Sequence, residues 1–294
     1  MINRLALGTA QFGLHYGVAN SQGQTPLAEV EQILSVARKA GLDTLDTAIA
    51  YGESEQILGR VGLDPWRVFT KLPAVPALPD HKASVEDWLA EMIAGSLARL
   101  RLDRLEGLLL HRPHDLLGPA GPRLFECLQT QKQRGLIGKI GVSVYGPDEL
   151  TSLCERYSLD IVQIPYNPLD RRLVESGWLQ RLKQTGAEIH VRSVFLQGLL
   201  LMPPAGRPAY FNRWQALWDC WDTWLADNHL SPLAACLRFA LSESAIDRVI
   251  VGIDSLQHFQ QVLAAAEGPM PSLPSDLCSD DPDLINPSRW QHRP

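Results

Sequence analysis

The stretch KIGVSVYGPDELTSLCERYSLDIVQIPY, residues 139–166, holds a strand, a helix and a second strand in direct succession. The two expected strands, KIGVSV and DIVQIPY, carry apolar side chains on both faces, and a helix near Pro147–Tyr157 separates them. Strands that are apolar on both faces are typical of a parallel sheet covered by helices. This stretch therefore predicts a parallel β–α–β unit.

The same alternation continues in both directions from this unit. Earlier strands are expected in RLALGTAQ, in the segment that ends at Asp46, in RVFTKL and in LEGLLLH, and later ones in EIHVRSV and RVIVGI. The first helix is expected over Pro26–Lys39, with Thr25 as its N-cap and Gly41 beyond its end. Further helices are expected over Glu53–Arg60, Ser84–Leu100, a segment ending at Arg134, Arg172–Thr185, 210–227, 232–241 and Leu256–Ala266.

Eight strand-then-helix units predict a single-domain (β/α)8 barrel, the TIM-barrel form of the α/β class. A doubly wound sheet is the competing architecture, and its dinucleotide-binding members carry GxGxxG after the first strand. Here GTAQFGLHYG, residues 8–17, spaces its glycines differently, and no P-loop motif occurs. We therefore expect residues 1–268 to form the barrel, and the proline- and acid-rich residues 269–294 to form a tail that packs on it.

Composition and charge argue against several classes of function. Hydrophobic residues make up 45% of the chain, and the net charge of −6 argues against nucleic acids and anionic membranes as partners. The five cysteines are scattered without a CxxC pair, so neither a zinc ribbon nor a disulfide framework is indicated. The N-terminal MINRLALGTAQFG is too polar for a signal peptide, and no apolar run reaches the length of a membrane helix. We expect a soluble cytoplasmic protein.

Ionisable side chains stand at the ends of three consecutive expected strands. The second strand ends at Asp46, the third at Lys71 and the fourth at His111, and Tyr51 follows in the loop after the second strand. In a (β/α)8 barrel the active site lies at the carboxyl ends of the strands. Any one of these residues alone is more often solvated or capping than catalytic, but their convergence at one rim predicts an active site.

The four residue types form a chemically coherent set. A tyrosine, with a pKa of about 10, is a poor proton donor at neutral pH unless a neighbouring ammonium lowers that pKa. Lys71 would supply the ammonium, Asp46 would hold it charged and oriented, and a neutral His111 would donate a hydrogen bond to a carbonyl oxygen. The set lacks a nucleophile for the carbonyl carbon, which indicates a hydride from a cofactor.

These motifs resemble those of the aldo-keto reductase superfamily over nearly the whole chain. LDTLDTAIAYGESEQILGR (residues 42–60), FTKL and LEGLLLHRP are similar to the segments that carry the family's catalytic tetrad. KIGVSVYGPDEL, IVQIPYNPLDR, VRSVFLQGLL and RVIVGIDSLQHFQQVLAA are similar to later family segments. The resemblance implies reduction of an aldehyde or ketone, or the reverse oxidation, with Tyr51 as general acid, Lys71 and Asp46 tuning it, and His111 orienting the carbonyl.

The resemblance also implies an extended nicotinamide dinucleotide across the barrel mouth. Ser143 and Gln163 match positions that contact the nicotinamide carboxamide, and the backbone of Phe195–Leu199 matches a pyrophosphate-binding loop, where Gly198 would allow close approach. The expected cofactor-binding residues are Ser143, Gln163, Arg192, Phe195, Gln197, Gly198, Leu199, Gly252, Asp254, Ser255, His258 and Gln261.

Three positions depart from the family pattern. Val144 stands where most members have an asparagine, and Arg192 where many have an aromatic residue that stacks on the nicotinamide. The Arg192 guanidinium could stack in the same way or form a salt bridge at the rim. Asp254 would repel an adenosine 2′-phosphate or accept from a ribose hydroxyl, unless it points to solvent and Ser255 caps the phosphate. NADP(H) and NAD(H) are therefore both open.

Two other functions are compatible with the same fold. A nicotinamide-dinucleotide-binding sensor or regulatory protein would keep the tetrad with negligible turnover, whereas an aldolase would use Lys71 as a Schiff-base nucleophile. The adjacent Asp46 argues for a charged lysine instead. We expect a small-molecule carbonyl substrate and a monomer or weak homo-oligomer.

Two clusters of residues suggest ligand sites but are expected to be structural. Trp214, Trp218 and Trp221 lie at helical spacing, which is more typical of core packing than of a ligand box. His111 and His114 lack an acid or cysteine at metal-ligand spacing, so we expect no metal.

Overall fold

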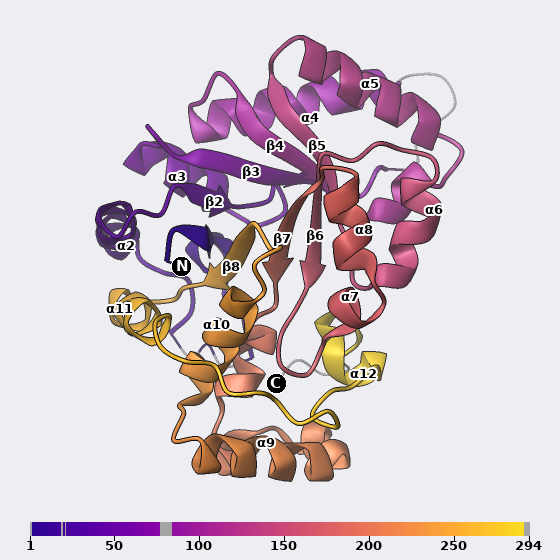
Figure 1. The fold of residues 1–294 in the computed structure, drawn as a ribbon. Coiled ribbons are helices and arrows are strands. Elements are labelled where there is room, and N and C mark those ends of the chain that lie inside the picture. Colours follow the sequence, from indigo (N-terminus) through magenta and orange to yellow (C-terminus); the bar gives the residue numbers. More distant parts are fainter. Residues whose placement is uncertain (1, 19, 21, 77–83, 291–294) are drawn as a thin grey trace.

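Eight parallel strands close into a barrel in the computed structural model, which describes residues 2–18, 20, 22–76 and 84–290. Neighbouring strands follow the order of the chain, and β8 returns to pair with β1 (Figure 1). The arrangement confirms the predicted (β/α)8 fold and its eight strands. Their bounds are β1 (Leu5–Gly8), β2 (Thr44–Asp46), β3 (Arg67–Leu72), β4 (Leu105–Leu110), β5 (Ile137–Ser143), β6 (Ile161–Pro165), β7 (Glu188–Arg192) and β8 (Arg248–Gly252).

The barrel closes where β1 meets β8, between strands whose residues are almost all apolar or small. Leu5 pairs with Val249, and both are 0% exposed. At the other end of the same seam, Gly8 pairs with Gly252. Since all eight strands run in one direction, their carboxyl ends meet at one rim, and the residues that end or follow each strand gather there.

Helices surround the barrel, and several begin where the sequence predicts. Ser84 caps α4 in a capping box with Asp87, in which each side chain bonds the other's backbone N–H. The described helices are α1 (Ala10–Gly13), α2 (Leu27–Lys39), α3 (Ser54–Val61), α4 (Val85–Leu100), α5 (Gly121–Gln133), α6 (Leu150–Cys154), α7 (Arg172–Glu175), α8 (Trp178–Gln184), α9 (Gln215–Asp227), α10 (Pro232–Ser242), α11 (Leu256–Ala265) and α12 (Pro282–Ile285).

Two predictions about helices are wrong. Thr25 does not cap α2, because Pro26 is extended (φ −61°, ψ 146°) and occupies the cap position. The Thr25 hydroxyl donates instead to the backbone oxygen of Asp254 at 3.2 Å. The single helix expected over Arg172–Thr185 is two helices, α7 and α8, because Gly177 between them adopts a left-handed conformation (φ 75°).

The segment after β7 and the C-terminal segment pack together beyond the barrel end toward which β6 and β7 point, where α9 lies in Figure 1. Trp218 and Trp221 are 1% and 0% exposed, which confirms their predicted place in the core. Trp224 and Trp214 donate from their indoles to the backbone of Ser272 and to Asp281, at 3.1 Å each. The described part of the expected tail is thus held by α9 and the residues just before it.

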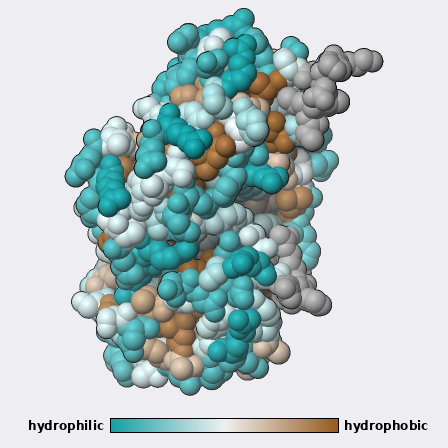
Figure 2. All heavy atoms as spheres, turned by 90° about the vertical axis from the view of Figure 1, so that its right-hand side faces the viewer, coloured by the Kyte–Doolittle hydropathy of each residue, from teal (hydrophilic) through white to brown (hydrophobic). Residues whose placement is uncertain are grey.

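The face in Figure 2 is mostly hydrophilic, with hydrophobic residues gathered in small patches. Of the large hydrophobic side chains described, Leu27, at 38% exposure, is the exposed one. Within the described chain, every helix is too short or too polar to cross a membrane.

Candidate active site

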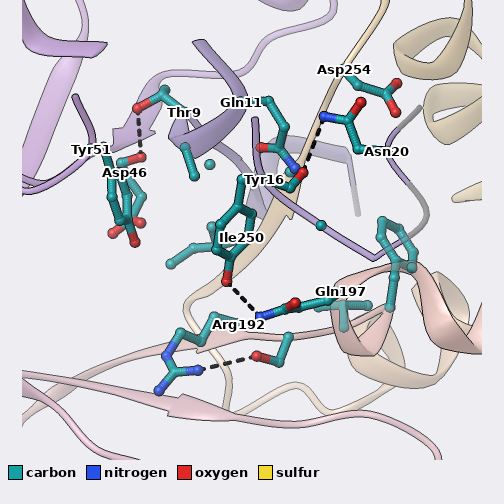
Figure 3. A pocket seen from close by; sticks show the side chains of 18 of the residues that line it. Thr9, Gln11, Tyr16, Asn20, Asp46, Tyr51, Arg192, Gln197, Ile250 and Asp254 are labelled. Carbon is teal, nitrogen blue, oxygen red and sulfur yellow. Dashed lines mark hydrogen bonds between the residues drawn. The ribbon is translucent and has the colours of Figure 1, made fainter. Parts of the chain in front are cut away.

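A cavity of about 410 Å³ opens at the carboxyl ends of the strands. Its lining comes from the segments that end or follow β1, β2, β4, β5, β7 and β8. Figure 3 shows Asp46 and Tyr51 on one side and Asp254 on another. We call the part around Tyr51, His111 and Arg192 the tyrosine end, and the part around Asp254 and His258 the aspartate end.

Lys71 and Asp46 form a buried ion pair at the tyrosine end. Lys71 lies in β3 and is 1% exposed, and its Nζ is 2.6 Å from Oδ2 of Asp46, the last residue of β2. Nζ also donates to the backbone oxygen of Thr47 at 2.9 Å. Burial lowers the pKa of the Lys71 ammonium, and Asp46 opposes that shift. Because a buried charge needs a partner, Asp46 favours the charged form of Lys71.

Tyr51 follows β2 and lies over this ion pair, with Nζ of Lys71 5.1 Å from the centre of its ring. Burial and Asp46 raise the pKa of the Tyr51 hydroxyl, whereas Arg192 opposes that shift. The hydroxyl is therefore protonated at neutral pH and can donate a proton. The sequence predicts that Lys71, held by Asp46, lowers the pKa of Tyr51. In the structure this pKa is raised instead by burial, Asp46 contributes to the rise, and Arg192 is the cation that favours the phenolate.

His111 follows β4 and lies edge-on to Tyr51, with ring centres 5.8 Å apart and ring planes at 82°. Burial, Lys71 and Arg192 lower the pKa of the imidazole to about 4. His111 is therefore neutral at physiological pH and keeps one ring N–H for donation to a carbonyl oxygen. The structure thus brings Asp46, Tyr51, Lys71 and His111 together.

A one-way chain of hydrogen bonds links Arg192 to the ion pair. Arg192 Nε donates to Ser143 Oγ at 3.3 Å, and Ser143 Oγ donates to Gln163 Oε1 at 3.1 Å. Gln163 Nε2 then donates to Asp46 Oδ1 at 2.7 Å. Ser143 and Gln163 are partners in the β5–β6 register, are 1% and 0% exposed, and do not belong to the described lining of the cavity. Their contact with a carboxamide stays a prediction.

Arg192 ends β7 and lines the cavity. Its guanidinium also donates to Ser193 Oγ at 3.1 Å and to the backbone oxygen of Val144 at 2.9 Å. The guanidinium carbon lies 4.8 Å from the ring centre of Tyr145. All its acceptors are neutral, and none of the salt bridges between described residues involves Arg192. The rim salt bridge that the sequence left open is therefore not formed.

The loop after β7 turns sharply beside the cavity. Gln197 and Gly198 have φ values of 54° and 91°, and the first is unusual for a residue with a side chain. Phe195, Gln197 and Gly198 line the cavity, whereas Leu199 is fully buried. Gln197 Nε2 donates to the Tyr16 hydroxyl at 3.2 Å, which joins this loop to the segment after β1 (Figure 3).

The aspartate end is acidic rather than basic. Asp254 lines the cavity, and its hydrogen bond with His258, 2.9 Å from Oδ1 to Nδ1, lowers the pKa of the carboxyl. Ser255 caps α11 by accepting from the His258 backbone N–H at 3.1 Å. At the same helix start, the Leu256 N–H donates to Glu29 Oε1 at 2.9 Å. The groups that the sequence left open for a phosphate are thus engaged within the protein.

Comparison with known proteins identifies the family. The sequence model of the Aldo/keto reductase family matches residues 4–272. The chain belongs to this family. It is 29% identical over 287 residues to D-threo-aldose 1-dehydrogenase from Pseudomonas sp., which covers 84% of this chain and 87% of that protein. It is also 29% identical over 259 residues to a probable voltage-gated potassium channel subunit beta from Oryza sativa subsp. japonica, with 79% of this chain and 78% of that protein covered.

The fold of this aldo-keto reductase also matches solved structures. The holo form of an aldo-keto reductase from Bacillus halodurans aligns with a TM-score of 0.71 at 20% identity, over 92% of this chain and 88% of that one. The likeness shows a shared fold. With the family match, it confirms the predicted superfamily and the oxidoreductase class of the family.

Several residues that line the cavity of this aldo-keto reductase are not predicted from the sequence. Gln11 follows β1, and its Oε1 is buried without a hydrogen-bond partner. The criterion that identified Asp46, a polar residue at the end of an expected strand, also applies to Gln11. Tyr16 and Tyr145 line the cavity from loops and carried no such signal. Of the remaining predicted cofactor residues, Gly252 belongs to the described lining and Gln261 does not.

Proposed function

We propose that this aldo-keto reductase reduces an aldehyde or ketone to an alcohol at the tyrosine end, with a nicotinamide dinucleotide as cofactor. The observation that supports the proposal is the convergence of a protonated phenol, a neutral imidazole and a buried ion pair at one end of one cavity. Tyr51 and His111 line that cavity, and Lys71 is buried behind them. Such a set can polarise a carbonyl group and deliver a proton to its oxygen.

The four residues divide this work in the proposed reaction. His111 donates a hydrogen bond to the carbonyl oxygen and so holds it toward Tyr51. Tyr51 gives its proton to the same oxygen as negative charge develops there. Lys71 stabilises the phenolate that remains, and Asp46 keeps the ammonium charged and in place. The cofactor, when bound, supplies the hydride to the carbonyl carbon.

The cavity fits a nicotinamide dinucleotide in its polar groups and its backbone. The unpartnered Oε1 of Gln11 offers an acceptor to a ligand N–H. A Cβ atom at Gly252 would lie 2.8 Å from Gln11 Nε2, so a side chain there would displace the Gln11 amide. The residues proposed to hold the cofactor are Gln11 and the implied residues that line the cavity, Arg192, Phe195, Gln197, Gly198, Gly252, Asp254 and His258. Contacts from the other implied residues, Ser143, Gln163, Leu199, Ser255 and Gln261, stay predictions.

NAD(H) is the preferred cofactor in this proposal, because the aspartate end repels an extra phosphate. Asp254 is held ionised by its hydrogen bond with His258, and Glu29 places a second carboxylate at the start of α11. An adenosine 2′-phosphate beside these groups would meet like charges. A ribose hydroxyl could instead donate to Asp254.

The reaction is tested with Tyr51→Phe and a panel of aldehydes and ketones. The variant is expected to lose at least about a hundredfold in kcat with little change in cofactor affinity, because it lacks the proton and keeps the ring. Tyr157→Phe is the matched control, since the Tyr157 hydroxyl donates to the Leu116 backbone oxygen outside the cavity. Wild-type protein that binds no nicotinamide dinucleotide, or a Tyr51→Phe variant with full activity, would refute the proposal.

The cofactor preference is tested by fluorescence titration with NADH and NADPH. Asp254→Asn removes one charge and is expected to improve NADPH affinity several-fold while NADH affinity stays level or falls. Asp280→Asn is the matched control: it removes one negative charge from an exposed position outside the cavity and should change neither the NADH affinity nor the NADPH affinity. A wild-type protein that binds NADPH more tightly than NADH would show that the charge argument is wrong.

A second candidate is a cofactor-binding sensor or regulatory role with negligible turnover. It is favoured by the 29% identity to the probable channel subunit from Oryza sativa. Tight cofactor binding without turnover over the whole carbonyl panel would support it over the reductase. A Schiff-base aldolase is disfavoured, because Lys71 Nζ is committed to Asp46 and to the Thr47 oxygen.

A further inference from the structure

Arg192 places a positive charge at the tyrosine end of the cavity, and no carboxylate among the described residues pairs with it. The other cation there, Lys71, is paired with Asp46 at 2.6 Å, so its charge is compensated nearby. Within the described part of the chain, Arg192 donates to two hydroxyl oxygens and one backbone carbonyl, all of which are neutral. The tyrosine end therefore carries an excess of positive charge.

We infer that Arg192 makes the site bind the reduced, uncharged nicotinamide more tightly than the oxidised, cationic one, and so biases the protein toward carbonyl reduction. The inference rests on the proposed function. Hydride transfer requires the nicotinamide ring to contact a carbonyl carbon whose oxygen Tyr51 and His111 hold. Arg192 lines the same end of the cavity and acts electrostatically on both of these residues. The ring must therefore bind within the field of the guanidinium.

The hydrogen bonds of Arg192 fix this charge in place. Its Nε, Nη1 and Nη2 each donate to an acceptor in the protein, at 3.3, 3.1 and 2.9 Å. The Tyr145 ring lies beside the guanidinium at 4.8 Å (Figure 3 shows Arg192 with one of these bonds). Three of its five N–H groups are engaged in this way, which holds the guanidinium in one orientation. What it offers a ligand is a fixed positive field.

Such a field should make the binding free energies of the oxidised and reduced cofactor differ. The oxidised nicotinamide ring carries one positive charge, and hydride addition removes it. Two like charges repel at short range in a partly buried site, whereas a neutral ring can stack on a guanidinium without this penalty. A neutral aromatic side chain would do the opposite, because its ring face attracts cations. The identity of residue 192 thus sets which form of the cofactor is held more tightly.

The test is equilibrium titration of the wild type, Arg192→Met and Arg192→Lys with NADH and with NAD⁺, without a carbonyl substrate. We expect the wild type to bind NADH at least about tenfold more tightly than NAD⁺. Arg192→Met should lower this ratio about tenfold, mainly by binding NAD⁺ more tightly, which corresponds to a fall of about 30 mV in the midpoint potential of the bound cofactor. Arg192→Lys keeps the positive charge but lacks the planar guanidinium with its several N–H donors, and it should retain most of the preference for NADH over NAD⁺.

Arg123→Met is the matched control, because it removes an exposed arginine outside the cavity and should leave the ratio unchanged. An Arg192→Met variant with the wild-type ratio, or an Arg192→Lys variant that behaves like Arg192→Met, would overturn the inference while the proposed function stands. A wild type that binds neither NADH nor NAD⁺, nor their phosphorylated forms, would overturn both.

Discussion

The buried pair of Lys71 and Asp46 should contribute to stability in a way that a surface pair does not. Replacing Lys71 by Met removes the ammonium and leaves the Asp46 carboxylate buried, with Gln163 Nε2 as its remaining side-chain donor. Loss of one partner of a buried pair costs about 3–5 kcal/mol, because an uncompensated charge remains. Replacing both, as Lys71→Met with Asp46→Asn, removes both charges and should cost only about 1–2 kcal/mol.

The measurement is urea denaturation followed by tryptophan fluorescence, for the two single variants and the double variant, without cofactor. Lys132→Met is the matched control, since Lys132 also lies 2.6 Å from a carboxylate, that of Asp160, but both side chains are about one third exposed. We expect this control to lose no more than about 1 kcal/mol. A Lys71→Met variant within about 1 kcal/mol of the wild type, or a double variant whose loss equals the sum of the single losses, would refute this account of the pair.

Two further changes test other parts of the structure. Glu55 is 1% exposed and accepts hydrogen bonds from Thr70, Ser96 and Arg99 at 2.7–2.8 Å. Glu55→Ala should therefore lower the free energy of unfolding by about 3 kcal/mol or more, because three donors lose their buried acceptor. A loss below about 1 kcal/mol in the same urea titration would contradict this role. The pKa of His111 is lowered from 6.5 to about 4 in the folded protein. Below pH 6.5 the unfolded chain therefore binds a proton at His111 that the folded protein does not, and the free energy of unfolding falls as the pH drops toward 4. Between pH 6.5 and 4 the free energy of unfolding of the wild type should fall by about 3 kcal/mol more than that of His111→Gln. Parallel plots of this free energy against pH for the two proteins would contradict the lowered pKa.

The barrel was predictable because most strands are short and apolar on both faces, and glycine, proline or polar residues separate them from the helices. The error at Thr25 has a tertiary cause. Local rules make a threonine before Pro26 a good cap, but its hydroxyl finds an acceptor in Asp254, far away in the sequence. The break at Gly177 has a local cause, a left-handed glycine that ends α7, which the helical pattern around it concealed.

The candidate site was predictable where it depends on strand ends and not where it depends on loops. Asp46, Lys71 and His111 follow from the rule that a barrel gathers its strand ends at one rim. Tyr16 reaches the cavity only because its loop folds back to Gln197, a contact that no periodic pattern encodes. The contacts of Arg192 likewise depend on the register that sets the strands side by side.

The chain of hydrogen bonds from Arg192 to Asp46 joins the two halves of the barrel. Asp46 belongs to the first four strands, whereas Gln163, Ser143 and Arg192 belong to the last four. The amide of Gln163 can satisfy both neighbours in only one orientation, with its oxygen toward Ser143 and its nitrogen toward Asp46. A chimera that combined one half-barrel of this protein with the complementary half of a relative would need matching residues on both sides of this junction. Substitutions at these positions are therefore expected to be acceptable in combination and damaging one at a time.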